Sequence, residues 1–346
     1  MDREREAFVP RTALLGELER QILLSTGCPG LLVYGRRRMG KSTLLRNLPG
    51  LLPPGVQVVQ ISMQRASAFN SLPNLLERIG QEVAAAVPDL PAPPVDLTAL
   101  ESFLAATDKR LDATGSRLLL ALDEYENLDR KIGEGVFSED LLSVLRESIQ
   151  THRHIIWTFA GSHAIDELTH APWTSYLVSA RTLEVTPFEP AETRLLLTEP
   201  LQQSSLWNTV ETERPRFEPG FWGESGIERI QAETGGWPHL VQLVAETVID
   251  LLNDTEKTRV DEALLERALD RAVVRGNNVF SELVEKESRL PGEWDYLCGF
   301  RSAATLSPPA DLAIDRSLRR RRLVLEEDGR FRLRAPLMAR WLRQGP

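Results

Sequence analysis

The sequence contains little cysteine and no long apolar run. Its 346 residues include only two cysteines, Cys28 and Cys298, which lie far apart in the chain. No apolar stretch approaches the roughly 20 residues that a membrane-spanning helix needs. The first six residues are mostly charged, unlike the apolar core of a secretory signal. These absences predict two reduced thiols, no membrane span and a cytoplasmic protein.

Positively charged residues are fewer than negatively charged ones over the chain as a whole. There are 41 lysine and arginine residues against 50 aspartate and glutamate residues, which gives a formal net charge of −9 at pH 7. This balance argues against a protein that coats nucleic acid with its whole surface. The segment from Arg301 onward is an exception, because arginines outnumber carboxylates there. The arginines that could form a local basic face are Arg316, Arg319, Arg320, Arg321 and Arg322.

What the sequence does contain is a phosphate-binding motif. Residues 35–43 fit the pattern G-x-x-x-x-G-K-[ST], a P-loop. The apolar run of residues 31–34 before it predicts a buried strand, and residues 42–48 after it predict a helix. Such a loop brings backbone N–H groups close to phosphates, at the positive end of the helix. The predicted phosphate-binding residues are Gly35, Arg36, Arg37, Arg38, Met39, Gly40, Lys41, Ser42 and Thr43.

Two side chains of the P-loop have individual roles in this prediction. Lys41 would reach the β- and γ-phosphates of ATP and act in catalysis, and the Ser42 hydroxyl would bind Mg²⁺. The alternative interpretation is a chance match in a basic surface loop. The strand before the motif and the helix after it favour the P-loop.

Two adjacent carboxylates end a second apolar segment. Residues 117–122 are apolar after the first and predict a strand buried on both faces, and Asp123 and Glu124 follow directly. Ligands of such parallel sheets bind at the carboxyl ends of the strands. We therefore predict that Asp123 holds Mg²⁺ and that Glu124 activates the attacking water. A solvated acidic loop is the alternative, and nearby Glu126 is expected to be a surface residue.

A further predicted strand, residues 154–162, ends in small polar residues. A hydroxyl at this position could contact the γ-phosphate or the attacking water. Ser162 is the first candidate and is assigned a catalytic role, and Thr158 is the second. The alternative is that the hydroxyl only caps the following helix.

The order of strands and helices predicts an α/β P-loop NTPase with a five-stranded parallel sheet, followed by a helical lid and a C-terminal winged helix. The first domain is placed at residues 1–200. Helices dominate residues 201–288, the lid, in which the glycine pair at 235–236 is expected to end one helix and Pro238 to start the next. Residues 289–346 are expected to contain short helices at about 293–303, 309–314 and 316–322 and then two short strands joined by a turn, which is typical of a winged helix. The strands expected for the sheet are residues 31–34, 56–61, 117–124, 154–162 and 182–185.

These motifs together resemble those of the AAA+/STAND-type P-loop ATPases of prokaryotes, in particular the archaeal-type ATPase group, and more loosely the origin-recognition initiators. The resemblance runs through the whole chain. The matching segments are residues 8–11 with 17–18, 34–43, 122–125, 160–162, 183–192, 234–238 and 331–342.

The resemblance implies roles for residues outside the P-loop. Val9, Pro10 and Arg11 would contact adenine, although the family usually has glycine where Pro10 stands. Pro238 in the lid would sense whether ADP or ATP is bound. Arg181 would act on the γ-phosphate of a neighbouring subunit, or would simply be a surface charge.

Three functions follow as hypotheses. In the first, the protein binds ATP or ADP with Mg²⁺, hydrolyses ATP slowly, and works as a switch that forms homo- or hetero-oligomers in the ATP state. It would regulate a separately encoded effector protein, as in a prokaryotic antiphage defence system. In the second, it is a DNA-binding AAA+ ATPase of replication, transposition or transcription, which contacts DNA through its winged helix. In the third, it binds nucleotide without hydrolysis.

Overall fold

The structure is a computed structural model that describes residues 7–24, 26–64, 70–205, 214, 216–255, 257–284 and 290–345. The chain divides into two compact units. The first consists of residues 1–36, 40–186 and 204–208, and the second of residues 37–39, 187–203 and 209–346. The finer division into three domains stays a prediction. In the described ranges no helix is both long and apolar enough to cross a bilayer.

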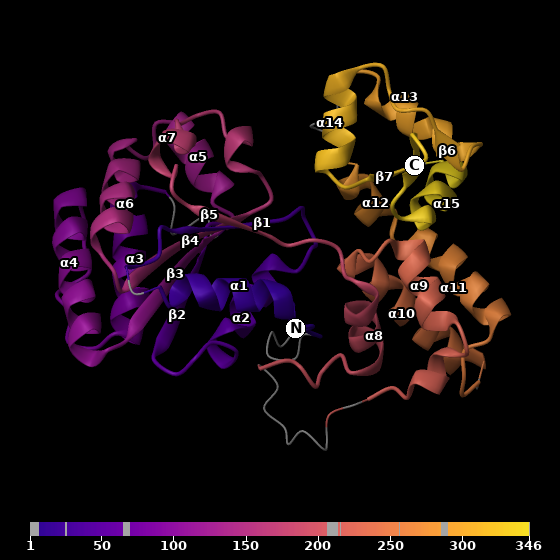
Figure 1. Ribbon diagram of the computed structural model, residues 1–346, viewed down its shortest axis with the longest axis horizontal. Helices are drawn as coiled ribbons and strands as arrows, with labels where there is room; N and C mark the ends of the chain where they lie inside the picture. The colour runs from indigo at the N-terminus through magenta and orange to yellow at the C-terminus, as the bar shows by residue number, and fades with distance from the viewer. Residues whose placement is uncertain are drawn as a thin grey trace. The chain divides into compact units, whose positions relative to one another are not determined.

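The first unit alternates strands with helices, and helices lie on both sides of the sheet (Figure 1). Its elements in chain order are α1 (Thr12–Ile22), β1 (Leu31–Tyr34), α2 (Lys41–Asn47), β2 (Val56–Ser62), α3 (Leu72–Ala86), α4 (Leu97–Thr114), β3 (Arg117–Asp123), α5 (Glu126–Gly133), α6 (Asp140–Thr151), β4 (Ile155–Gly161), α7 (Trp173–Tyr176) and β5 (Arg181–Glu184). Local signals fix several of the ends. The Asp96 carboxylate, for example, accepts a hydrogen bond from the Ala99 backbone N–H and so begins α4, and Gly115 ends it with φ 63°.

The five strands form one parallel sheet in the order β2-β3-β4-β1-β5. The register sets Tyr34 of β1 level with Gly161 of β4 and Glu184 of β5. Asp123 of β3 lies level with Ala160 of β4. The P-loop and the two carboxylates therefore follow strands that end at the same edge of the sheet, as the sequence predicts.

The core of this unit is built around the central strands. Every residue of β4 is buried, and so is every residue of β3 after Arg117. Trp157 of β4 stacks on Phe159, and its indole N–H donates to the Ser148 hydroxyl of α6. These residues explain why both strands are near-continuous apolar runs in the sequence.

The sequence does not predict helix α5. Only Leu128 and Asp129 of its eight residues are buried. A short helix with so few buried side chains has no apolar periodicity to reveal it. Its position matters, because it begins at Glu126, directly after the carboxylate pair.

The second unit is mainly helical. Its elements are α8 (Pro190–Thr198), α9 (Gly226–Thr234), α10 (Pro238–Thr255), α11 (Glu262–Arg275), α12 (Asn277–Leu283), α13 (Glu293–Cys298), β6 (Thr305–Leu306), α14 (Leu312–Arg320), β7 (Val324–Glu327), β8 (Arg330–Leu333) and α15 (Pro336–Gln344). Helix α10 packs on both α9 and α11. Helix α10 begins at Pro238, as predicted from the glycine pair before it.

The last elements form a small antiparallel sheet with helices around it. The strand order is β6-β8-β7, and the turn between β7 and β8 contains Asp328 and Gly329, both with positive φ. Trp341 of α15 stacks on Phe280 of α12 and donates its indole N–H to the Asn277 side chain. Helices followed by a β-ribbon are thus present, and the assignment as a winged helix stays a prediction.

The two helices expected at residues 309–314 and 316–322 are in fact one, α14. The Asp311 carboxylate accepts from the Ala313 N–H and sets the start of this helix. Asp315 and Arg319 form an ion pair four residues apart, which supports the helix across the expected break.

Candidate active site

The P-loop joins β1 to α2 and takes the conformation that its two glycines allow. Gly40, the residue before α2, has φ 88°, which disfavours any side chain. Gly35 lies against β5, because a Cβ added there would be 2.6 Å from the Val185 carbonyl oxygen. The loop is therefore held tightly against the sheet at its start and turns sharply into the helix.

Lys41 is folded into the loop. Its ammonium donates to the Gly35 carbonyl at 2.6 Å and to the Arg36 carbonyl at 3.1 Å, and the residue is 8% exposed. Both acceptors are uncharged backbone oxygens. Phosphate oxygens are stronger partners for an ammonium group, so this buried charge is well suited to binding them.

The other basic residues of the loop are paired with carboxylates. Arg36 donates to Glu167 at 3.0 Å within the first unit. Arg37 and Arg38 belong to the second unit, in which Arg38 donates to Glu282 of α12 at 2.5 Å and lies 3.2 Å from the His239 ring of α10. To bind phosphate as predicted, these arginines would have to leave their carboxylate partners.

Asp123 ends β3 as a buried carboxylate that is only half satisfied. Its Oδ2 accepts from the Gln60 side chain of β2 at 3.0 Å. Its Oδ1 is buried and has no hydrogen-bond partner among the described residues. Burial raises its pKa, and this outweighs the opposing effects of Ser42, Gln60 and the Lys41 charge. A buried oxygen without a partner, beside a serine hydroxyl, fits a divalent cation such as Mg²⁺.

Glu124 departs from the strand geometry. Its φ is 62°, a region that non-glycine residues rarely occupy. Burial raises the pKa of its carboxyl; a hydrogen bond from Gln64 opposes this, while the charges of Glu126 and Asp123 add to it. A carboxylate with a raised pKa is a better proton acceptor, which suits the role of general base.

Ser162 lies at the carboxyl end of β4, beside the start of the P-loop, since the Gly35 N–H donates to the Gly161 carbonyl. Its hydroxyl donates to Glu126 Oε1 at 2.7 Å, and its backbone N–H donates to the same oxygen at 3.2 Å. The expectation that Glu126 is a surface residue is wrong. Only 17% of its side chain is exposed, because the chain enters α5 with this carboxylate turned toward β4.

The environment of Glu126 strongly favours its charged form. Burial, the largest single influence, acts to raise its pKa. Hydrogen bonds from His163 and Ser162, together with backbone N–H groups, outweigh burial and lower the pKa to about 2. Glu126 is therefore an ionised carboxylate at neutral pH.

Thr158 and Arg181 lie away from the edge of the sheet that carries the P-loop. Both are level with Leu31, the first residue of β1. Thr158, the second candidate for the γ-phosphate contact, is buried inside β4 and is excluded from that role by its position. Arg181 is exposed at the start of β5. It is far along the strand from the P-loop of its own chain, so a role toward a neighbouring subunit stays a prediction.

The residues expected to contact adenine lie before α1. Val9 is buried, and the Arg11 guanidinium donates to the Thr186 carbonyl at 2.6 Å, which ties this segment to the end of β5. Pro238 is buried at the start of α10. The roles of Val9, Pro10, Arg11 and Pro238 toward the nucleotide stay predictions.

The expected basic face at the C-terminal end is smaller than the sequence suggests. Arg321 is 4% exposed, pairs with Glu293 and donates to the Val284 carbonyl, so it is part of the core. Arg319 is bound by Asp315 and Glu326 and lies over the Phe331 ring. The structure therefore does not support Arg319 as a DNA contact, and the prediction that Arg321 contacts DNA is wrong.

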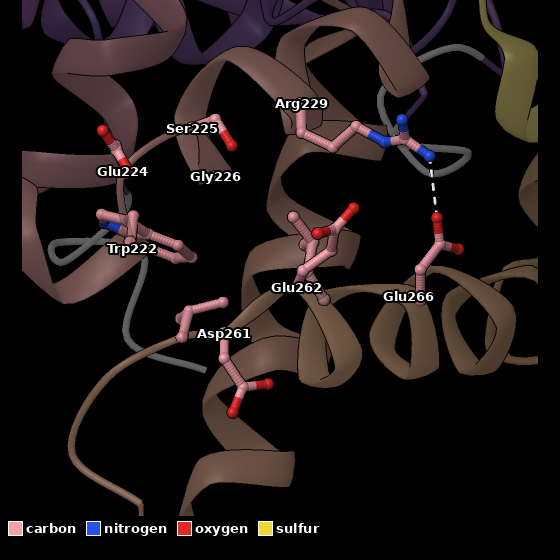
Figure 2. Close-up of a pocket in the computed structure, with 11 residues that line it drawn as sticks. Trp222, Glu224, Ser225, Gly226, Arg229, Asp261, Glu262 and Glu266 are labelled. Atoms are coloured by element: carbon pink, nitrogen blue, oxygen red, sulfur yellow. Dashed lines mark hydrogen bonds and ion pairs between the residues drawn. The ribbon is translucent and has the colours of Figure 1, made fainter.

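A pocket in the second unit does not suit a nucleotide. It has a volume of about 300 Å³ and lies between the starts of α9 and α11. Figure 2 shows that Glu224, Asp261, Glu262 and Glu266 surround it, with Arg229 bonded to Glu266. This excess of negative charge would repel phosphates.

Besides Glu126, the site contains Gln60 and Gln64, and no sequence pattern identified these two residues. Gln60 lies in β2, which also contains the polar residues Gln57 and Ser62, so its residue type alone does not single it out. Gln64 follows β2 without a distinguishing pattern.

Comparisons with known proteins support the fold. Residues 24–169 match the family described as "AAA domain". No curated protein matches the chain. The Walker-type ATPase PABY2304 of Pyrococcus abyssi is 16% identical, with 97% of this chain and 96% of that chain covered and a TM-score of 0.63. The ORC2 protein of Aeropyrum pernix, in ADPNP–ADP complexes, is also 16% identical, with 99% and 95% covered and a TM-score of 0.56. At these identities the two structures show a shared fold, and the expected resemblance to AAA+ ATPases is confirmed.

Proposed function

Because this chain is a P-loop ATPase that carries an AAA domain at residues 24–169, we propose that it works as a cytoplasmic molecular switch set by ATP and reset by hydrolysis. The observation that carries the chemistry is the meeting of Lys41, Ser42, Asp123 and Glu124 at one edge of the parallel sheet. Both cysteines are free thiols, which fits a reducing compartment.

Each of these residues has its own role in the reaction ATP + H₂O → ADP + phosphate. Lys41 leaves the carbonyls of Gly35 and Arg36 and binds the β- and γ-phosphates. Ser42 and Asp123 would hold Mg²⁺, whose charge offsets that of the phosphates. Glu124 accepts a proton from the attacking water, aided by the raised pKa of its carboxyl.

Replacing Glu124 by glutamine tests this assignment. Glu124→Gln removes the base and keeps the size of the side chain, so ATP should stay bound while phosphate release falls at least about a hundredfold. The matched control is Glu101→Gln, an exposed residue of α4, which should turn over ATP like the wild type. Equal turnover by Glu124→Gln and wild type would contradict the role of Glu124.

The switch proposal follows from what distinguishes the two nucleotides. A ligand shifts a conformational equilibrium only by its different affinity for the two states. At the P-loop, the γ-phosphate is the group that ATP has and ADP lacks, and it would supply this difference.

Control of a separate effector, in an antiphage system, is the finer part of the proposal and rests on the STAND resemblance. ATP-dependent oligomerisation belongs to it, with the exposed Arg181 acting on a neighbouring subunit. The test is the mass of the protein with ADP and with a non-hydrolysable ATP analogue, alone and with the products of neighbouring genes. A monomer under all conditions that binds no such product would refute it.

DNA binding is the second candidate, favoured by the exposed arginines of α14, Arg316 and Arg320. Phosphate contacts by such residues weaken steeply as salt rises. Duplex binding should be measured by fluorescence anisotropy at several salt concentrations, for wild type and for Arg316→Glu with Arg320→Glu. Arg78→Glu on α3 is the control. Binding that is absent, or equal in all three proteins, would remove this candidate.

A further inference from the structure

The carboxylate of Glu126 holds Ser162 by two hydrogen bonds and has no part in the reaction described above. Both the backbone N–H and the hydroxyl of Ser162 donate to its Oε1. The next residue, His163, lies 3.5 Å from the same oxygen. Ser162 is therefore fixed in position and in orientation by a residue two places beyond the general base.

The direction of this hydrogen bond limits what Ser162 can do. A serine hydroxyl has one proton and two lone pairs. The proton points to Glu126, because a carboxylate at 2.7 Å can only accept. The His163 ring nitrogen, 3.4 Å from the hydroxyl, occupies at most one lone pair. At the edge of the sheet, the Ser162 hydroxyl can therefore only accept a further hydrogen bond.

An acceptor suits the attacking water and does not suit the γ-phosphate. Water carries protons that it can donate, whereas the γ-phosphate oxygens are themselves acceptors. We propose that Glu126 is a positioning residue that turns Ser162 into an acceptor for the attacking water, so that Ser162 and Glu124 hold this water together. This inference rests on the ATPase activity of the chain and assigns no role in nucleotide binding to either Ser162 or Glu126.

The surrounding backbone is arranged around this contact. A Cβ at Gly161 would clash with Glu126 Oε2 and with the Tyr125 ring, so only glycine permits the close approach. The Tyr125 hydroxyl donates to the His163 carbonyl at 2.8 Å and fixes the other side of Ser162. Glu126 is also the first residue of α5, where the helix N-terminus favours a negative charge.

The proposal predicts that substitutions at Ser162 and Glu126 change the turnover of ATP and leave the affinity for nucleotides nearly unchanged. Ser162→Ala and Glu126→Ala should each lower kcat for ATP about tenfold, or about 1.4 kcal/mol in the activation free energy. The double variant should be no slower than either single one, because the two residues act as a unit. Dissociation constants for ADP and for a non-hydrolysable ATP analogue should change less than about twofold. Glu126→Gln, whose amide oxygen still accepts, should retain most of kcat.

The experiment is phosphate release at saturating ATP with Mg²⁺, with calorimetric titration of both nucleotides, at a temperature below the melting point of each variant. Glu134→Ala, an exposed acid just beyond the C-terminal end of α5, is the matched control and should behave as wild type. The proposal is overturned if Glu126→Ala turns over normally. It is also overturned if Ser162→Ala weakens the ATP analogue relative to ADP about tenfold, since that marks a donor to the γ-phosphate. A wild-type protein without turnover would instead overturn the ATPase activity itself, and this inference with it.

Discussion

Replacing Glu126 by glutamine should lower the free energy of unfolding of the first unit at neutral pH, and the loss should disappear in acid. Glutamine resembles the protonated carboxyl, since it keeps the oxygen and removes the charge. The folded protein lowers the pKa of Glu126 from 4.5 to about 2. At about 1.4 kcal/mol for each tenfold change in proton affinity, the loss at pH 7 should be about 3 kcal/mol.

The pH window follows from the direction of this shift. A carboxyl whose pKa is lowered by folding stabilises the protein fully at pH values above its unfolded pKa, which is about 4.5. That stabilisation is lost as the pH falls toward about 2, because both states are then protonated. The difference between wild type and Glu126→Gln should thus be constant from pH 7 to about 5 and shrink below that.

The measurement is urea unfolding at a series of pH values, followed by pulsed hydrogen–deuterium exchange on peptides of β4. This strand reports the first unit separately from the second, so the two transitions are not mixed. Glu134→Gln is the control, since this exposed carboxylate pairs with Lys131 and Arg130 at the surface. A difference that stays constant down to pH 3 would refute the electrostatic explanation. No difference at pH 7 would show that the hydrogen bonds do not stabilise the charged form.

Three further predictions concern other parts of the molecule. Lys41→Ala should raise the dissociation constant for ATP by about 10–100-fold in a calorimetric titration, because a charge-assisted hydrogen bond contributes about 1.5–3 kcal/mol. Asp129→Ala should lower the free energy of unfolding of the first unit by about 3–5 kcal/mol, since it leaves the Ala171 N–H and the Trp173 indole N–H buried without an acceptor. Gly236→Ala should lower the melting temperature of the second unit, because its φ is 74° and a Cβ would clash with the Phe188 carbonyl; Gly220→Ala in the same unit, with open space around it, should not.

The parallel sheet could be predicted because its strands are buried on both faces. A segment such as residues 117–123 is apolar almost throughout, and the motif at residues 35–43 has few other interpretations. The predicted ends of these strands agree with the structure to within one residue. The convergence of the P-loop and the carboxylates then follows from parallel strands having a common edge.

Features that depend on long-range contacts could not be predicted. Glu126 has the composition of a surface residue, and only the path of the chain into α5 brings it to Ser162. Arg321 is part of a run of four arginines in the sequence, but it is buried beside Glu293, 28 positions earlier. In both cases the identity of the partner, and not the residue itself, decides the role.

The backbone at Glu124 has a consequence for how this site can vary. In an extended strand, neighbouring side chains point to opposite faces, so two consecutive carboxylates would be separated by the sheet. The positive φ of Glu124 interrupts this alternation, and the Asp123 charge is felt by the neighbouring carboxyl. The spacing of the proposed cation ligand and the proposed base is therefore set by one peptide unit. Insertion of a single residue between Asp123 and Glu124 would separate the two proposed roles, metal binding and water activation, while both carboxylates remained present.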